Sequence, residues 1–140
     1  MRISAIADTG FVVALISQQD AKHQQVSPIY YQQQAILLPQ TISILAETAY
    51  LLAKDMGNLA VAVFPESLPE SRFQLVALEG TDIIRISQIL RNYADSRIDF
   101  VDASVMAIAE RFNLTAILTL DQRDFRLFRP KHCQNFTLWP

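Results

Sequence analysis

The sequence predicts a three-layer α/β/α fold with a central, mostly parallel sheet of about five strands. Short apolar runs alternate along the chain with stretches in which apolar residues recur every three or four positions. Within the short runs, apolar and polar residues do not alternate, which is typical of parallel strands buried on both faces. The chain has 140 residues, 51% of them hydrophobic, which suits one domain with a full core. We therefore expect residues 1–140 to form a single domain.

The first half of the chain is expected to contain two strands and three helices. Their predicted order is a strand at 3–7, a helix after Gly10, a polar helix between Asp20 and Gln34, a strand at 35–38 and a helix from Thr41 to Met56. The last of these has the clearest helical spacing, and Gly57 is a natural stop for it.

The second half begins with a segment rich in Pro, Glu and Ser at 64–71, which we interpret as a loop around a short helix. The elements expected after it are a strand at 73–78, a helix at 82–93, a helix at 99–112, a strand at 116–120 and a last strand at 136–139.

The charge and cysteine content limit the possible function classes. A net charge of −2 argues against a protein that grips nucleic acid through a broad basic surface. A local basic cluster does occur late in the chain, and its ordinary interpretation is a solvated face; it comprises Arg123, Arg126, Arg129 and Lys131. With Cys133 as the single cysteine, no disulfide can form within the chain, so a reducing cytoplasm is expected. No apolar run approaches the length of a membrane span.

Four carboxylates stand almost alone in apolar sequence: Asp8, Glu47, Asp102 and Asp121. Two unit charges about 4 Å apart interact by roughly 4 kcal/mol at an effective dielectric near 20, so convergent carboxylates need a cation or a proton. Asp8 and Asp121 each follow a predicted strand, where the carboxyl ends of a parallel sheet carry binding sites. A divalent metal is the obvious counter-charge.

Each of these acids also has a structural interpretation. Asp8 and Asp121 could cap the helices that follow them. Glu47 is the sole charge from 40 to 53, in the middle of an apolar helix, so it is either buried, cleft-facing or on a solvent face. Asp99 could be a helix N-cap with Asp102 at the third helical position, which leaves one of the two free to point into a cleft.

Other kinds of active site find little support. His23 and His132 have no spacing that suggests a histidine metal pair, and no serine lies in a nucleophile-elbow context. Three glycines are too few for a Gly-rich phosphate loop. An oxygen-ligand site for Mg²⁺ or Mn²⁺ is therefore the metal site that the residues support.

Four segments, in this order, resemble the PIN-domain ribonucleases, and within that family the small VapC-type toxins of toxin–antitoxin pairs. They are Ile6-Ala7-Asp8-Thr9-Gly10, Ala46-Glu47-Thr48, Asp99-Phe100-Val101-Asp102-Ala103-Ser104, and Ile117-Leu118-Thr119-Leu120-Asp121 followed by Asp124-Phe125. No single segment is specific, but their order and spacing are, and the resemblance covers essentially the whole chain.

The resemblance implies a PIN-like fold and a Mg²⁺- or Mn²⁺-dependent endoribonuclease that hydrolyses RNA phosphodiester bonds through metal-activated water. It assigns the catalytic and metal-binding roles to Asp8, Glu47, Asp102 and Asp121, and accessory roles to Asp99, Thr9, Thr119 and Asp124. It also gives the basic cluster after Asp121 a role in holding RNA phosphates: Arg123, Arg126, Arg129 and Lys131. The partners that it implies are an RNA substrate, a small antitoxin and a second copy of the chain, with no membrane.

Two alternatives are weighed against this interpretation. An aspartyl-phosphate enzyme of the haloacid-dehalogenase type would need a second Asp where Gly10 stands, and a receiver would need an acidic pair near the first strand. A catalytically silent PIN-like binding module is the other alternative, and the retained acids argue against it.

Overall fold

The centre of the molecule is a five-stranded sheet in which every strand pairs in parallel with its neighbours. The computed structural model describes residues 2–39 and 42–140. The strand order is β3-β2-β1-β4-β5, and the strands are β1 (Ile3–Ala7), β2 (Ala35–Pro39), β3 (Phe73–Val76), β4 (Ala116–Leu118) and β5 (Thr137–Trp139). The predicted α/β/α class with a parallel sheet of about five strands is confirmed.

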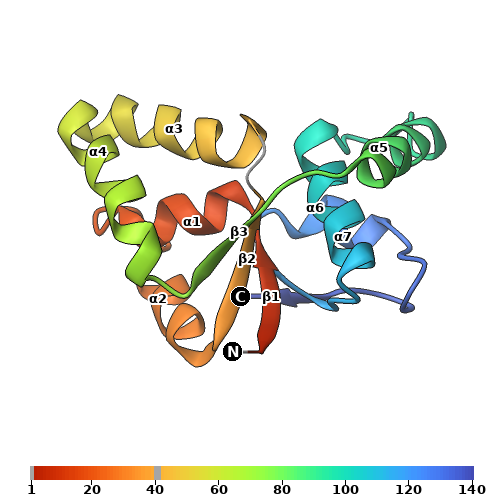
Figure 1. The fold of residues 1–140 in the computed structure, drawn as a ribbon, viewed down its shortest axis with the longest axis horizontal. Helices are drawn as coiled ribbons and strands as arrows, with labels where there is room; N and C mark the ends of the chain where they lie inside the picture. The colour runs from red at the N-terminus through yellow and green to blue at the C-terminus, as the bar shows by residue number, and fades with distance from the viewer. Residues whose placement is uncertain (1, 40–41) are drawn as a thin grey trace.

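Helices cover both faces of the sheet, which makes three layers (Figure 1). One face carries α1 (Thr9–Ile16), α2 (His23–Gln32), α3 (Glu47–Met56) and α4 (Asn58–Ser67). The other carries α5 (Gly80–Asn92), α6 (Phe100–Arg111) and α7 (Gln122–Leu127). A π-helix at Ile42–Ala46 precedes α3, and a 3-10 turn at Leu68–Glu70 follows α4.

The core lies on both sides of β1 and β2, as their uninterrupted apolar sequences predict. All five residues of β2 are buried, and so are Ala5, Ile6 and Ala7 of β1. Helix α6 is buried along its length from Asp102 to Ala109, because it packs directly on these two strands. A carboxylate at the first turn of α6 is therefore carried into the centre of the molecule.

The chain reverses its winding direction between β1 and β4. From β1 the chain runs outward through α1 and α2 to β2, and later returns across the sheet through α5 and α6 to β4, which pairs with the other side of β1. Ligands of open parallel sheets bind at such a switch point, outside the carboxyl ends of the strands. Asp8 directly follows β1 and Asp121 lies three residues after β4, so the topology brings both to this edge.

Two predictions about the middle of the chain need correction. The continuous helix expected from Thr41 to Met56 is divided into the π-helix and α3, with Glu47 as the first residue of α3; Thr41 lies outside the described residues. Helix α4 was not predicted, since Pro65 was taken as a loop signal. This proline lies in the last turn of α4, where it removes one backbone hydrogen bond, and the helix ends two residues later at Ser67.

Ion pairs tie the two long helices of the second face together. Arg111, at the end of α6, binds Asp82 at 2.9 Å and Glu79 at 3.2 Å, at the start of α5. Arg85 of α5 forms a 2.6 Å pair with Glu110 of α6. Within the described residues, no helix has both the length and the apolar character to cross a bilayer.

Candidate metal centre

A cleft of about 610 Å³ opens at the carboxyl ends of β1 and β4. It is lined by Asp8, Thr9, Gly10, Glu47, Arg97, Asp99, Val101, Asp102, Leu120, Asp121 and Asp124. The structure thus brings to one cleft all four acids predicted as metal ligands, together with three of the four predicted accessory residues. Six of its eleven lining residues are acidic, and Arg97 is the one basic residue among them.

Three of these carboxylates converge most closely. Oxygen atoms of Asp102, Asp121 and Asp124 lie within 4.8 Å of one another. We call these three residues the acidic triad. Asp8 and Glu47 line the same cleft outside the triad. Asp124, which was predicted as an accessory residue, therefore belongs to the most closely spaced group of carboxylates.

Asp8 is both a helix cap and a cleft residue, so the two interpretations left open by the sequence hold together. Its Oδ1 accepts a 2.8 Å hydrogen bond from the backbone N–H of Thr9, at the start of α1. Its Oδ2 accepts a 3.2 Å hydrogen bond from the hydroxyl of Thr119. Burial raises the pKa of Asp8 to about 6, and the charges of Glu47 and Asp121 add to this effect against the two hydrogen bonds.

Asp99 and Asp102 form the capping box that their spacing predicted. The Asp99 side chain accepts from the backbone N–H of Asp102 at 2.9 Å, and the Asp102 side chain accepts from that of Asp99 at 3.2 Å. Asp99 is exposed, whereas Asp102 is buried beneath it. Burial, followed by the charges of Asp99 and Asp8, raises the pKa of Asp102 to about 8. Asp102 therefore favours the protonated form at neutral pH unless a cation compensates its charge.

Glu47 faces the cleft from the opposite wall and is exposed. The sequence left three positions open for Glu47: buried, facing a cleft or facing solvent. In the structure its side chain lines the cleft and is also exposed to solvent. Desolvation and the charge of Asp99 still raise the pKa of Glu47. It lies at the start of α3, directly after the π-helix, and lines the same cleft as Asp102 of α6.

Asp121 and Asp124 enter the triad from the start of α7. Asp121 is the residue before the helix, is exposed, and makes no capping hydrogen bond with its side chain, so its carboxylate is free for other contacts. Asp124 lies in the first turn and is buried. Its pKa is raised by burial first and by the charge of Asp121 second, while the cations Arg123 and Arg97 lower it.

The residues of the cleft fit a divalent cation. Among residues 2–39 and 42–140, none of the six acids forms a salt bridge. The hydroxyl of Thr9, which lines the cleft, is fully buried and has no hydrogen-bond partner within the same ranges. Closely spaced carboxylate oxygens with no basic partner are the donor set that Mg²⁺ and Mn²⁺ prefer. Asp102, Asp121 and Asp124 could hold such an ion, with Asp8 beside them.

The four members of the basic cluster have different local surroundings. Arg126 donates to Gln122 at 2.7 Å, and Arg129 donates to the carbonyl of Arg126 at 2.7 Å. The backbone N–H of Lys131 binds Glu110, which lies at the opposite end of α6 from Asp102. Of the four, Arg123 is the one whose charge acts on the triad.

Arg97, which no sequence motif singled out, lines the cleft from the loop between α5 and α6. It stands two residues before Asp99, and this proximity was the only available signal. Thr119 does not line the cleft, but its hydroxyl binds Asp8 and accepts the N–H of Asp121, so it supports two acids from below.

Comparisons with known proteins agree with this architecture. The family model described as "PIN domain" matches residues 5–129. Over 135 residues the chain is 30% identical to ribonuclease VapC26 of Mycobacterium tuberculosis, a match that covers 96% of this chain and 99% of that protein.

Solved structures share the fold at lower sequence identity. VapC20 of M. tuberculosis, described as a toxin that cleaves the sarcin–ricin loop, has a TM-score of 0.73 at 19% identity, over 81% of this chain and 87% of that one. VapBC2 of Rickettsia felis, bound to a DNA fragment from its promoter, has a TM-score of 0.70 at 15% identity, over 99% of this chain and 100% of that one. The family match over most of the chain and the identity to a curated relative show that the chain belongs to the PIN-domain family.

Proposed function

We propose that this protein is a Mg²⁺- or Mn²⁺-dependent endoribonuclease and the toxin of a toxin–antitoxin pair. The observation that carries the proposal is the acidic triad at the switch point of the sheet, whose three carboxylates lie within 4.8 Å and form no salt bridge within the described residues. The curated relative is a ribonuclease, and VapC20 is a toxin that cleaves RNA. We also propose that residues 1–140 act as one PIN-like domain.

The triad and Asp8 have distinct tasks in this proposal. A divalent cation at the triad would supply Lewis-acid chemistry, which lowers the pKa of water and offsets charge on phosphate oxygens. Asp102, Asp121 and Asp124 would hold the cation, and Asp8, with a pKa near 6, would accept a proton from the attacking water. Glu47, on the exposed wall, would bind a cation that arrives with the substrate. Thr9 and Thr119 would orient Asp8 and its surroundings.

RNA cleavage by purified protein tests the proposal directly. Asp121→Asn should abolish cleavage of a labelled RNA in Mn²⁺, while the thermal stability in EDTA stays unchanged or rises, because one repelling charge has been removed. Asp20→Asn is the matched control, since Asp20 is a partly exposed acid of the loop after α1 and outside the cleft. Cleavage by Asp121→Asn at the wild-type rate, or no cleavage by the wild type in Mg²⁺ or Mn²⁺, would contradict the proposal.

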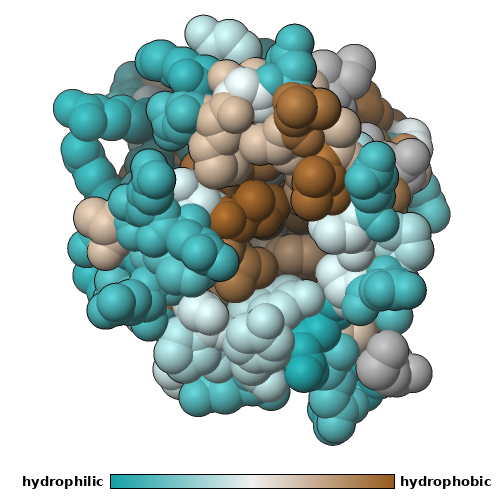
Figure 2. Space-filling model, turned by 90° about the vertical axis from the view of Figure 1, so that its left-hand side faces the viewer, coloured by the Kyte–Doolittle hydropathy of each residue, from teal (hydrophilic) through white to brown (hydrophobic). Residues whose placement is uncertain are grey.

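The antitoxin and a second copy of the chain are the proposed protein partners. Exposed apolar side chains on α3 and α4 support such contacts, among them Leu59 at 86% exposure, Tyr50 at 67% and Val63 at 59%. Figure 2 shows apolar side chains around a hollow on the side formed by α2 and α4, and Phe64 and Tyr30 are among its lining residues. Large exposed apolar patches of this kind mark interaction surfaces.

The partner proposal has its own tests. The molar mass in solution should be that of a dimer, and Leu59→Asp should shift it towards the monomer. A short reading frame next to the gene should encode a protein that co-purifies with this chain and suppresses its RNA cleavage. The cytoplasm is the proposed compartment, because the expected substrate is RNA and the lone Cys133 is unpaired.

A further inference from the structure

A second cavity adjoins the metal cleft, and the proposed RNA cleavage gives it no role so far. Its volume is about 480 Å³, within the range of small-molecule sites. Arg97 and Asp124 line both this cavity and the metal cleft, so the two are neighbours. Arg123 and Leu127 of α7 form one wall of the cavity, and the loop after α5 forms the opposite wall. We call it the side cavity.

The two arginines of the side cavity have no ion-pair partner in the part of the chain that the structure describes. Within residues 2–39 and 42–140, neither Arg97 nor Arg123 forms a salt bridge or a side-chain hydrogen bond, in contrast to Arg126 and Arg129. Both act on the carboxylate of Asp124, whose pKa each of them lowers. Two exposed guanidinium groups thus flank the triad on the same side.

The loop that carries Arg97 is held firmly in place. The hydroxyl of Ser96 donates to the carbonyl of Tyr93 at 2.7 Å and accepts the backbone N–H of Ile98 at 3.1 Å. Ile98 is buried in the core. Arg97 therefore projects from a fixed backbone, and less entropy is lost when it binds a ligand.

The cavity also offers an apolar wall. Leu127 is 48% exposed, and the ring of Tyr93 packs against Phe128 with ring centroids 5.5 Å apart. The Tyr93 hydroxyl accepts the backbone N–H of Arg129, which fixes the ring. A wall with one aliphatic and one aromatic side chain suits a nucleobase, and two guanidinium groups beside it suit a phosphate.

We propose that the side cavity binds the nucleotide next to the scissile phosphate of a single-stranded RNA, with its phosphate between Arg97 and Arg123 and its base against Leu127 and Tyr93. This inference rests on the proposed ribonuclease function. It adds the path of the bound strand over the protein surface, which runs over α7 and the α5–α6 loop and away from Lys131. Asp95 also lines the cavity, so the two arginines outweigh it only while a cation offsets Asp124. RNA binding here should therefore depend on the metal.

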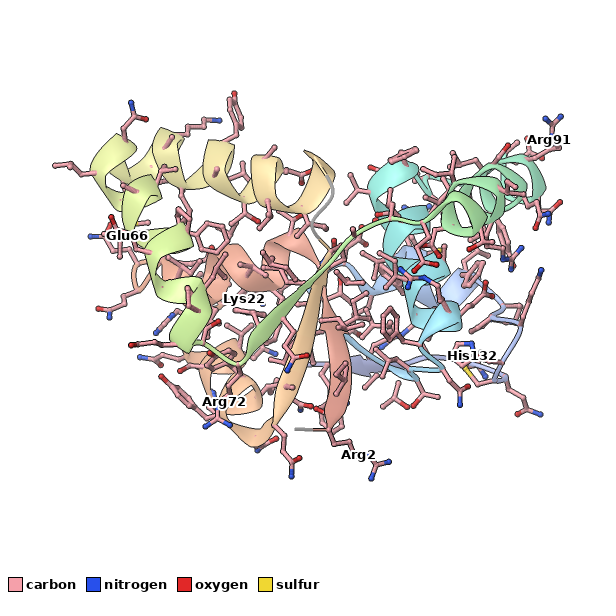
Figure 3. The ribbon with its side chains drawn as sticks, viewed as in Figure 1. Arg2, Lys22, Glu66, Arg72, Arg91 and His132 are labelled. Carbon is pink, nitrogen blue, oxygen red and sulfur yellow. The ribbon has the colours of Figure 1, made fainter. Side chains whose placement is uncertain are left out.

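The test measures binding of a short fluorescein-labelled single-stranded RNA by anisotropy, with Ca²⁺ present to occupy the acids while cleavage is slow. Arg97→Gln and Arg123→Gln should each weaken binding about five- to tenfold and reduce the slope of log K against log salt by about 1. Arg2→Gln is the matched control, because Arg2 is exposed and precedes β1, at the end of the sheet opposite to the cleft (Figure 3). Lys131→Gln tests the rival path and should resemble the control.

The outcomes separate the two proposals. If the wild type cleaves RNA but Arg97→Gln and Arg123→Gln bind like Arg2→Gln, the side cavity does not hold the strand and the ribonuclease proposal stands. Loss confined to Lys131→Gln would place the strand on the opposite path. If the wild type neither binds nor cleaves RNA with any divalent ion, both proposals are overturned. The salt slope distinguishes a lost phosphate contact from damage to the fold, which would also lower the melting temperature.

Discussion

The hydroxyl of Thr119 donates to Oδ2 of Asp8 at 3.2 Å, across the seam between the ends of β4 and β1. The same hydroxyl oxygen accepts the backbone N–H of Asp121 at 3.1 Å. Thr119 is fully buried. One side chain therefore sets the spacing between a strand-terminal acid and an acid of the triad, although 111 residues separate Asp8 from Thr119 in the chain.

Thr119→Val should show what this bridge contributes. Valine keeps the shape but leaves Asp8 with one hydrogen bond fewer and leaves the N–H of Asp121 without this acceptor. We expect a loss of about 1–2 kcal/mol in the free energy of unfolding and a higher pKa of Asp8. Urea denaturation and NMR titration of the carboxyl carbon measure the two effects. Thr119→Ser retains the hydroxyl and should keep the Asp8 pKa near 6; an unchanged pKa in Thr119→Val would contradict the role of the bridge.

The raised pKa values predict how the metal-free protein responds to pH. An unfolded Asp titrates near 3.9, whereas Asp8 in the folded protein titrates at about 6 and Asp102 at about 8. The folded state thus binds more protons than the unfolded state between these values, so the stability that these two groups contribute is fully present below about pH 4 and is lost as the pH rises to about 8. In EDTA the melting temperature should drop by several degrees from pH 5 to pH 8.

Asp102→Asn supplies the control for the pH effect. Asparagine has the same shape and no charge, so this variant should lose most of the fall between pH 6 and 8 and be more stable than the wild type at pH 8 in EDTA. Added Mn²⁺ should restore wild-type stability at pH 8 and leave the variant little changed, because ligand binding to the folded state raises its stability. A wild-type melting temperature that does not change with pH would contradict the prediction, because it would mean that the charge of Asp102 costs the metal-free protein no stability.

The sequence predicted the sheet and the positions of its terminal acids, because these depend on local patterns. Non-alternating apolar runs identified β1, β2 and β4, and a chain with parallel strands must place Asp8 and Asp121 at one edge. The capping box of Asp99 and Asp102 was also predicted, since a three-residue spacing is enough to specify it.

Other features depend on interactions that no local pattern reveals. The break before Glu47 is a π-helix that makes this residue the start of α3, and helical periodicity alone cannot distinguish it from a continuous helix. Pro65 suggested a loop because a proline is usually excluded from helix interiors, yet α4 continues through it to Ser67. The convergence of Asp124 with Asp102 and Asp121, and the place of Arg97, depend on how α7 lies beside α6 and the loop before it, which only the folded chain shows.

The geometry of the triad predicts an order of metal affinities among the acids. Asp124→Asn should weaken Mn²⁺ binding about as much as Asp121→Asn, by tenfold or more, because both remove an oxygen of the same group. Glu47→Gln should weaken it less, since Glu47 is exposed and outside the triad. Isothermal titration calorimetry with Mn²⁺ measures all three. If Glu47→Gln lost more Mn²⁺ affinity than Asp124→Asn, the ion would lie closer to α3 than the triad predicts.

The ion pair between Arg111 and Asp82 should support the fold and not the cleft. Asp82 is buried and Arg111 is partly buried, so Arg111→Met strands a buried carboxylate and should cost about 2–4 kcal/mol of unfolding free energy. Glu79, the other partner of Arg111, is 61% exposed, and Glu79→Gln should cost well under 1 kcal/mol. Urea denaturation separates the two variants.

Mn²⁺ affinity should be unchanged in both, because the pair joins the start of α5 to the end of α6 and the triad lies at the other end of α6. A loss of Mn²⁺ affinity in Arg111→Met at a temperature where it is fully folded would mean that the α5–α6 packing sets the geometry of the triad.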